Sequence, residues 1–150
     1  MKLSVAADEY HHVVGVVLAE LEKMGHTVTY HGPRSEDPPG QPQHSWPVVA
    51  RRVAEEVAHG KADEGILFCW TGTGVSLAAN KVRGIRAALC VDAETARGAR
   101  LWNNANILCL SLRLTSEAVA REILQTWFNT SYQPNPTDDA CLKLIEELDK

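Results

Sequence analysis

A glycine-rich stretch in the middle of the chain carries the residue types best suited to chemistry. It reads Cys69-Trp70-Thr71-Gly72-Thr73-Gly74-Val75 and passes from an apolar run into a helical pattern. Glycines allow a ligand to approach the backbone closely, and the free N–H groups of a first helical turn carry the positive end of the helix dipole. The stretch therefore predicts an anion site, for a phosphate or an enediolate oxygen. Because neither Gly-Lys-Ser/Thr nor a third glycine follows, ATP and NAD are poor ligands, and we expect no cofactor.

Three side chains near this turn are candidates for a functional role. Cys69 ends the preceding strand pattern, and a helix N-terminus favours the thiolate form of a nearby thiol, so Cys69 is a candidate base or nucleophile. The alternative is an inert buried cysteine. Thr71 offers a hydroxyl beside it or merely caps the turn. Asp8 ends the first strand pattern and would lie next to Cys69 in a neighbouring strand, unless it caps a helix instead.

Strand and helix patterns alternate along the whole chain. Apolar strands are expected at residues 2–7, 26–30, 65–69, 85–91 and 106–110, and amphipathic helices near 14–24, 47–59, 93–102, 116–128 and 138–148. This alternation predicts parallel strands joined by right-handed crossovers. We therefore expect a three-layer αβα, doubly wound, five-stranded parallel sheet in the order 2-1-3-4-5, with ligands at the carboxyl ends of the strands.

Length and loops indicate one domain. The 150 residues match one domain in size, with residues 131–150 forming a C-terminal loop and helix. Residues 32–47 hold five of the seven prolines and form a long loop, and long loops are often functional.

Composition excludes several classes of protein. Apolar residues make up 45% and charged residues 23% of the chain, which argues against disorder. The formal charge of −4, with no Lys/Arg tract, disfavours nucleic acid. No run approaches the roughly 18 apolar residues of a membrane span. The four cysteines show neither CxxC pairing nor metal-ligand spacing, so we expect reduced thiols, no bound metal and a cytoplasmic protein.

The stretch from Cys69 onward resembles a known enzyme family. Residues 69–81 read Cys-x-Thr-Gly-x-Gly-x-Ser-x-Ala-Ala-Asn-Lys, and the related positions after them are Gly84-Ile85-Arg86-Ala87-Ala88, Asp92, Ala96-Arg97, Asn103, Ala105-Asn106 and Arg113. This pattern is similar to the ribose-5-phosphate isomerase B and galactose-6-phosphate isomerase family over residues 2 to 130. The resemblance implies a flavodoxin-like sheet, a homodimer or tetramer with shared active sites, and metal-free aldose–ketose isomerisation of a sugar or sugar phosphate.

The resemblance also implies a role for each matching residue. Cys69 would move a proton between C1 and C2 through a cis-enediolate, with Thr71 as its hydroxyl partner and Asp8 as a ligand of a substrate hydroxyl. The developing oxyanion would be held by the amides of Gly72, Thr73, Gly74 and Val75. Asn103 and Arg113 would contact substrate, with Arg113 reaching the phosphate across the dimer.

Several positions depart from the family pattern. Glu9 follows Asp8 where the family has a histidine, and Trp102 replaces the histidine thought to open the sugar ring; an indole N–H is only a donor and cannot take up a proton. No arginine follows Arg121, so the tail lacks a phosphate clamp. Trp70 replaces a glycine in the loop, and Trp46 takes the place of a tyrosine at the rim of the site.

Three functions therefore remain open. The chain is an isomerase for a different sugar, with Trp70 and Trp102 stacking on sugar faces; or one subunit of a hetero-oligomeric isomerase; or a non-catalytic sugar-phosphate-binding relative. His11 and His12 open the first helix near Asp8, so one of them could replace the ring-opening group. The other histidines are expected at the surface: His26, His31, His44 and His59. Trp127 is expected in the core or in an interface.

Overall fold

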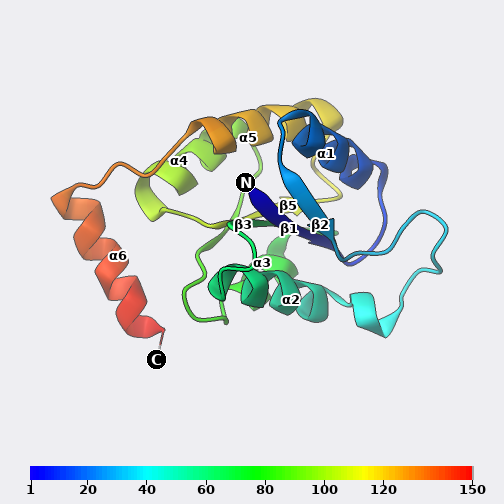
Figure 1. Cartoon of the computed structure of the whole chain (residues 1–150), viewed down its shortest axis with the longest axis horizontal. Helices are drawn as coiled ribbons and strands as arrows, with labels where there is room; N and C mark the ends of the chain where they lie inside the picture. The colour runs from blue at the N-terminus through cyan, green and yellow to red at the C-terminus, as the bar shows by residue number, and fades with distance from the viewer. Residues whose placement is uncertain (150) are drawn as a thin grey trace.

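The computed structural model describes residues 1–149 and has three layers, with a parallel sheet between two sets of helices (Figure 1). The strands are β1 (Lys2–Ala7), β2 (Thr27–Tyr30), β3 (Glu64–Cys69), β4 (Ala87–Leu89) and β5 (Ile107–Ser111). The helices are α1 (His12–Lys23), the 3-10 helix η1 (Pro42–His44), α2 (Trp46–Ala58), α3 (Thr73–Ala79), α4 (Ala93–Asn103), α5 (Glu117–Asn129) and α6 (Pro136–Leu148). The predicted fold class is thus confirmed.

The order of the last two strands differs from the prediction. The sheet runs β2-β1-β3-β5-β4, so β5 and not β4 lies beside β3. Burial explains the exchange: every residue of β5 is buried, whereas the three residues of β4 are only half-buried. A long apolar strand belongs inside a covered sheet, and a short strand of small residues suits the edge.

The direction of each crossover decides which face its helix covers. The chain steps in one direction from β1 to β2 and from β4 to β5, and α1 and α4 pack with α5 on one face. It steps the other way from β2 to β3 and from β3 to β4, and α2 and α3 cover the opposite face. Right-handed crossovers require this segregation. The chain reverses direction between β1 and β3, which is where a doubly wound sheet opens its crevice.

Two asparagines of the family-like pattern hold the edge of the sheet. Asn80 follows α3, and its side chain accepts from the Ala87 N–H (2.8 Å) and donates to the Ala87 carbonyl (2.9 Å). Asn106 accepts from the Arg86 N–H (2.8 Å) and donates to the Gly84 carbonyl (2.9 Å). These side chains replace ladder partners that the short strand β4 lacks, so their role is structural.

Helix α6 stands apart from the three layers (Figure 1). None of its described residues is buried, and Leu144, Ile145 and Leu148 are exposed. The Asp149 carboxylate just after it accepts a hydrogen bond from the Gly84 N–H (2.8 Å). An amphipathic helix that leaves its apolar stripe uncovered needs a partner surface. Within residues 1–149, no helix is long and apolar enough to span a bilayer.

A buried ion pair closes the amino-terminal edge of the sheet. Glu64 opens β3, and its carboxylate accepts from Arg100 (2.7 Å) and from the Trp127 indole (2.6 Å). The Arg100 guanidinium also lies over the Trp127 ring at 4.9 Å. Trp127 is fully buried, so its expected core role is confirmed. Removing one partner from such a pair leaves the other charge buried and unpaired.

We therefore expect Arg100→Met to lower the free energy of unfolding by about 3–5 kcal/mol at neutral pH. Urea denaturation measures the effect. The matched control is Arg51→Met, which removes an arginine from an exposed pair with Glu55 and should cost no more than about 0.5 kcal/mol. Equal losses in the two variants would show that the Glu64 pair is solvated.

Candidate active site

Asp8 and Cys69 lie side by side at the carboxyl edge of the sheet. β1 and β3 pair in parallel with Ala7 opposite Phe68, and the Asp8 N–H donates to the Phe68 carbonyl (3.3 Å). Asp8 and Cys69 are the next positions on their two strands. Paired residues of parallel strands project to the same face of a sheet, so both side chains lie on the side that carries α2 and α3. Asp8 caps no helix, because the N-cap of α1 is His11.

Cys69 differs from the other two buried cysteines by its place in the sheet. It is 4% exposed and ends β3 immediately before the glycine turn. Burial raises the pKa of the Cys90 thiol to about 12 and raises that of the Cys109 thiol even further. Those two thiols stay protonated and are therefore inert.

The turn after Cys69 is shaped by Gly72. Its φ of 75° is left-handed, and a Cβ there would lie 3.1 Å from the Leu110 backbone, so only glycine fits. The Gly72 N–H donates to the Cys69 carbonyl (3.2 Å). The remaining free donors of this turn are the N–H groups of Thr73, Gly74 and Val75, which have no partner within a helix. The Thr71 and Thr73 hydroxyls are 2.6 Å apart and hydrogen-bonded.

Trp46 forms a wall of the same region. It is the first residue of α2, and a Cβ on Gly74 would come within 3.0 Å of the indole. The ring therefore lies against the first turn of α3, and its 42% exposure leaves one side free. The structure thus brings Trp46 together with the glycine turn, as the sequence predicted for the rim of the site.

A small polar cavity adjoins Asp8. It has a volume of about 160 Å³ and lies between the β1–α1 turn and the loop before α2. Residues lining it include Asp8, Glu9, Tyr10, Arg34, Asp37 and His44. Burial, followed by the repulsion of the Glu9 carboxylate, raises the pKa of Asp8 to about 6. Sequence reasoning missed His44, since no local pattern links the proline-rich loop to the first strand.

A second hollow lies at the carboxyl edge on the side of α1 and α5. It has a volume of about 490 Å³ and is lined by Trp70, Arg113 and both helix-start histidines, His11 and His12. The Trp70 carbonyl accepts from the Arg113 N–H (3.0 Å), which joins the ends of β3 and β5. The two imidazole rings are 4.4 Å apart. We call this hollow the Arg113 groove.

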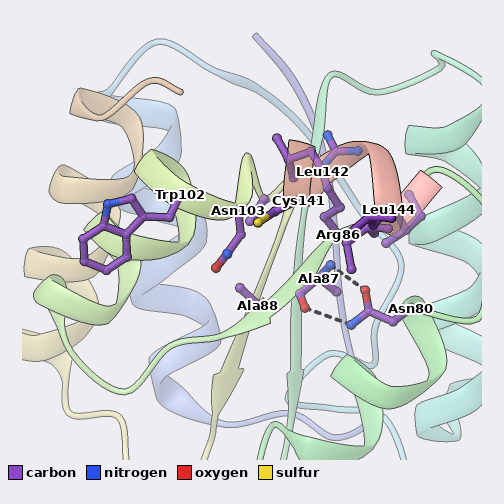
Figure 2. A pocket seen from close by; sticks show the side chains of 12 residues that line it. Asn80, Arg86, Ala87, Ala88, Trp102, Asn103, Cys141, Leu142 and Leu144 are labelled. Carbon is purple, nitrogen blue, oxygen red and sulfur yellow. Dashed lines mark hydrogen bonds between the residues drawn. The ribbon is translucent and has the colours of Figure 1, made fainter. Parts of the chain in front are cut away.

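Trp102 and Asn103 do not join these residues within one chain. They end α4, which runs antiparallel to the strands, so they lie at the opposite, amino-terminal edge of the sheet. Figure 2 shows Asn103 close to Cys141 of α6, whereas the Trp102 indole points away from that helix and lies over Gly98 of α4. This apolar groove has a volume of about 480 Å³, and Trp102 is 55% exposed.

The expected placement of the histidines is partly wrong. The His31 side chain is only 7% exposed and lies 2.9 Å from the Glu56 carboxylate, and the His26 ring packs tilted against Phe128 with ring centroids 4.3 Å apart. His44 is half-buried, whereas His59 lies at the surface as predicted. Within residues 1–149, no group of three or more His, Cys, Asp or Glu side chains could hold a metal ion.

The raised pKa of Asp8 predicts a pH-dependent stability effect. The folded-state pKa of about 6 exceeds the ordinary 3.8, so the stabilisation is present below about pH 4 and is lost as pH rises through about 6. Asp8→Asn should therefore have a higher urea midpoint than the parent protein at pH 7, with the difference vanishing below about pH 4. A lower midpoint at pH 7 would contradict the buried-carboxylate interpretation.

Known proteins resemble this chain along nearly its whole length. The profile of the family described as Ribose/Galactose Isomerase matches residues 4–144. Galactose-6-phosphate isomerase subunit LacB of Clostridium acetobutylicum is 35% identical over 99% of this chain and 83% of that protein. D-erythrulose-4-phosphate isomerase of Pectobacterium atrosepticum is 40% identical over 75% of this chain and 72% of that protein.

A solved structure agrees with the same assignment. Ribose-5-phosphate isomerase B of Clostridium thermocellum superimposes with a TM-score of 0.89 at 33% identity and covers 99% of this chain and 97% of that one. The suspected resemblance is thus confirmed, and this chain belongs to the ribose/galactose isomerase family.

Proposed function

We propose that the protein is an aldose–ketose isomerase of a sugar phosphate, with Cys69 as the base that carries the proton. The observation that carries this proposal is a strand-end thiol placed directly before a turn of free backbone amides. Asp8 lies on the adjacent strand end, where it can bind a substrate hydroxyl. Relatives act, by their names, on phosphates of four- to six-carbon sugars, so the class of substrate follows from the family.

In this mechanism Cys69 acts on the open-chain sugar. The thiolate removes the proton from C2 of the aldose, and the C2–H electron pair forms the C1–C2 double bond of an enediolate as the C1 carbonyl becomes an oxyanion. The amides of Thr73, Gly74 and Val75 hold that oxyanion. The Thr71 hydroxyl passes the O2 proton to O1, and the Cys69 thiol returns its proton to C1, which gives the ketose.

The phosphate of the substrate belongs in the Arg113 groove of the same chain, and not across the dimer as the resemblance implied. The guanidinium of Arg113 is exposed there, beside His11 and His12, at the same edge of the sheet as Cys69. A guanidinium binds phosphate oxygens in a fork geometry. These three side chains take over the task of the arginines that the C-terminal segment lacks, and Trp70 forms an apolar wall beside them.

We also propose a homodimer with shared sites. Trp102 and Asn103 lie at the wrong edge to meet the Cys69 of their own chain, so they reach a Cys69 site only from a second copy. The exposed indole of Trp102, the apolar groove of Figure 2 and the uncovered stripe of α6 give that copy a surface to bury.

A second candidate is one subunit of a hetero-oligomeric isomerase. Two observations favour it: the Clostridium acetobutylicum relative is named as a subunit, and Trp102 stands where the family has its ring-opening histidine. A partner chain would then supply that histidine. Turnover of any sugar phosphate by the purified chain alone contradicts this candidate.

A reducing compartment suits this chemistry, and we propose the cytoplasm. The sulfur of the base must stay unoxidised, because it accepts the proton as a thiolate, and Cys69, Cys90, Cys109 and Cys141 are all free. Glutathione and thioredoxin keep such thiols reduced in the cytosol.

Replacing the base tests the isomerase directly. Cys69→Ala should lower kcat by about 10²–10⁴-fold on the best substrate among aldose and ketose phosphates of four to six carbons. In deuterated water the parent protein should also wash deuterium into C1 or C2 of that substrate. Cys90→Ala, on the far face of the sheet, is the control and should keep its activity. Binding without deuterium exchange across the panel would favour the non-catalytic relative.

Subunit mixing tests the shared site. Cys69→Ala and Asn103→Ala should each be nearly inactive, but unfolding and refolding a 1:1 mixture should restore about a quarter of the parent activity, because half the dimers then carry one intact site. A mixture of Cys69→Ala with Asp8→Asn is the control and should recover nothing, since both residues come from one chain. Recovery in neither mixture, or in both, contradicts the shared site.

A further inference from the structure

Two buried polar atoms in the described chain lack a hydrogen-bond partner in the protein. They are Asp8 Oδ1 and His44 Nδ1. Both residues line the same cavity of about 160 Å³, although one follows β1 and the other ends η1. Burying a polar atom without a partner costs free energy, so two such atoms on residues that line one cavity point to a bound group as their partner.

The chemistry of the two atoms defines that group. A carboxylate only accepts hydrogen bonds, whereas the Nδ1 atom of a neutral imidazole either donates or accepts. A hydroxyl satisfies both at once, because it donates to Asp8 Oδ1 and accepts from the protonated Nδ1 of His44. The dianion of a phosphate monoester, its main form at pH 7, fails because its oxygens only accept. The carboxylates of Asp8, Glu9 and Asp37 also outnumber the single guanidinium of Arg34 in this lining.

The position of the cavity ties it to the proposed reaction. Asp8 is the neighbour of Cys69 across β1 and β3. His44 precedes Trp46 by two residues, and Trp46 lies against Gly74 in the first turn of α3. The cavity therefore lies on the Asp8 side of this region, with Asp8 between its other lining residues and the strand end that carries Cys69. Its volume equals roughly five water molecules at about 30 Å³ each, enough for part of a sugar.

We propose that His44 is a specificity-determining residue, which together with Asp8 binds one hydroxyl of the substrate and so holds the hydroxyl-bearing end of the sugar in this cavity. The phosphate then lies away from the cavity, in the Arg113 groove. This inference rests on the proposed function and deepens it, because it fixes the direction in which a sugar phosphate lies across the site. It also predicts that sugars lacking that hydroxyl are rejected.

Alditol phosphates test the proposal, because they carry the hydroxyls and cannot isomerise. Calorimetry with erythritol 4-phosphate, ribitol 5-phosphate and galactitol 6-phosphate identifies the tightest ligand of the parent protein. His44→Ala should weaken that ligand by about tenfold. His44→Asn keeps a donor near the place of Nδ1 and should stay within about threefold of the parent, whereas His44→Gln places its amide near Nε2 and should resemble His44→Ala.

Inorganic phosphate serves as the ligand control. Its affinity should be the same in the parent protein and all three variants, because the proposal puts phosphate elsewhere. An alditol phosphate affinity that His44→Ala leaves unchanged, or a parallel loss of inorganic phosphate affinity, overturns the proposal.

Nitrogen NMR of the unmutated protein keeps the test independent of how the variants fold. Addition of the tightest alditol phosphate should shift the Nδ1 resonance of His44, while His59, at the end of α2, should not move. An unshifted His44 resonance at saturating ligand overturns the proposal.

The two levels of inference can fail separately. Deuterium exchange by the parent protein, together with binding that does not depend on His44, supports the isomerase and contradicts the role of His44. Binding that depends on His44, without deuterium exchange into any sugar phosphate of the panel, supports the hydroxyl site and contradicts the isomerase. A parent protein that binds none of the three alditol phosphates contradicts both.

Discussion

The pairing of β1 with β3 is the constraint on which the rest of the site depends. It places the ends of two buried strands side by side where the chain changes direction, so a carboxyl group and a thiol become neighbours although sixty residues separate them in the sequence. The backbone must leave the sheet immediately beyond that point. Gly72 makes the departure tight enough that the next helix begins at Thr73, only four residues after Cys69.

The antiparallel run of α4 separates two groups of candidate site residues. Because a helix returns from one edge of the sheet to the other, residues at its two ends cannot serve one site in the same molecule. Trp102 and Asn103 are thus remote from Cys69 of the same chain for a topological reason. Helix α6 lies at the same edge and exposes Leu144, Ile145 and Leu148 there.

Much of the site could be predicted from local signals. The apolar run into a glycine turn identified Cys69 and the amides, and the end of the first strand identified Asp8. The neighbouring positions of β3 and β5 could not be predicted in the same way, since strand order depends on the relative burial of whole strands. His44 could not be predicted as a site residue, because it reaches the cavity beside Asp8 only through the folding of the loop before α2. No residue spacing in the sequence indicates that arrangement. The buried place of His31 was missed for the same reason, since its partner Glu56 lies on another element.

The register between β3 and β5 also decides how the thiol of Cys69 responds to oxidants. Leu67 pairs with Cys109 and Cys69 pairs with Ser111, so the two cysteines sit diagonally on neighbouring strands. Strand spacing and rise put their Cα atoms about 8 Å apart, beyond the roughly 7 Å that a disulfide tolerates. A disulfide between Cys69 and Cys109 would therefore require the two strands to shift, so neighbouring thiols on this face of the sheet stay separate.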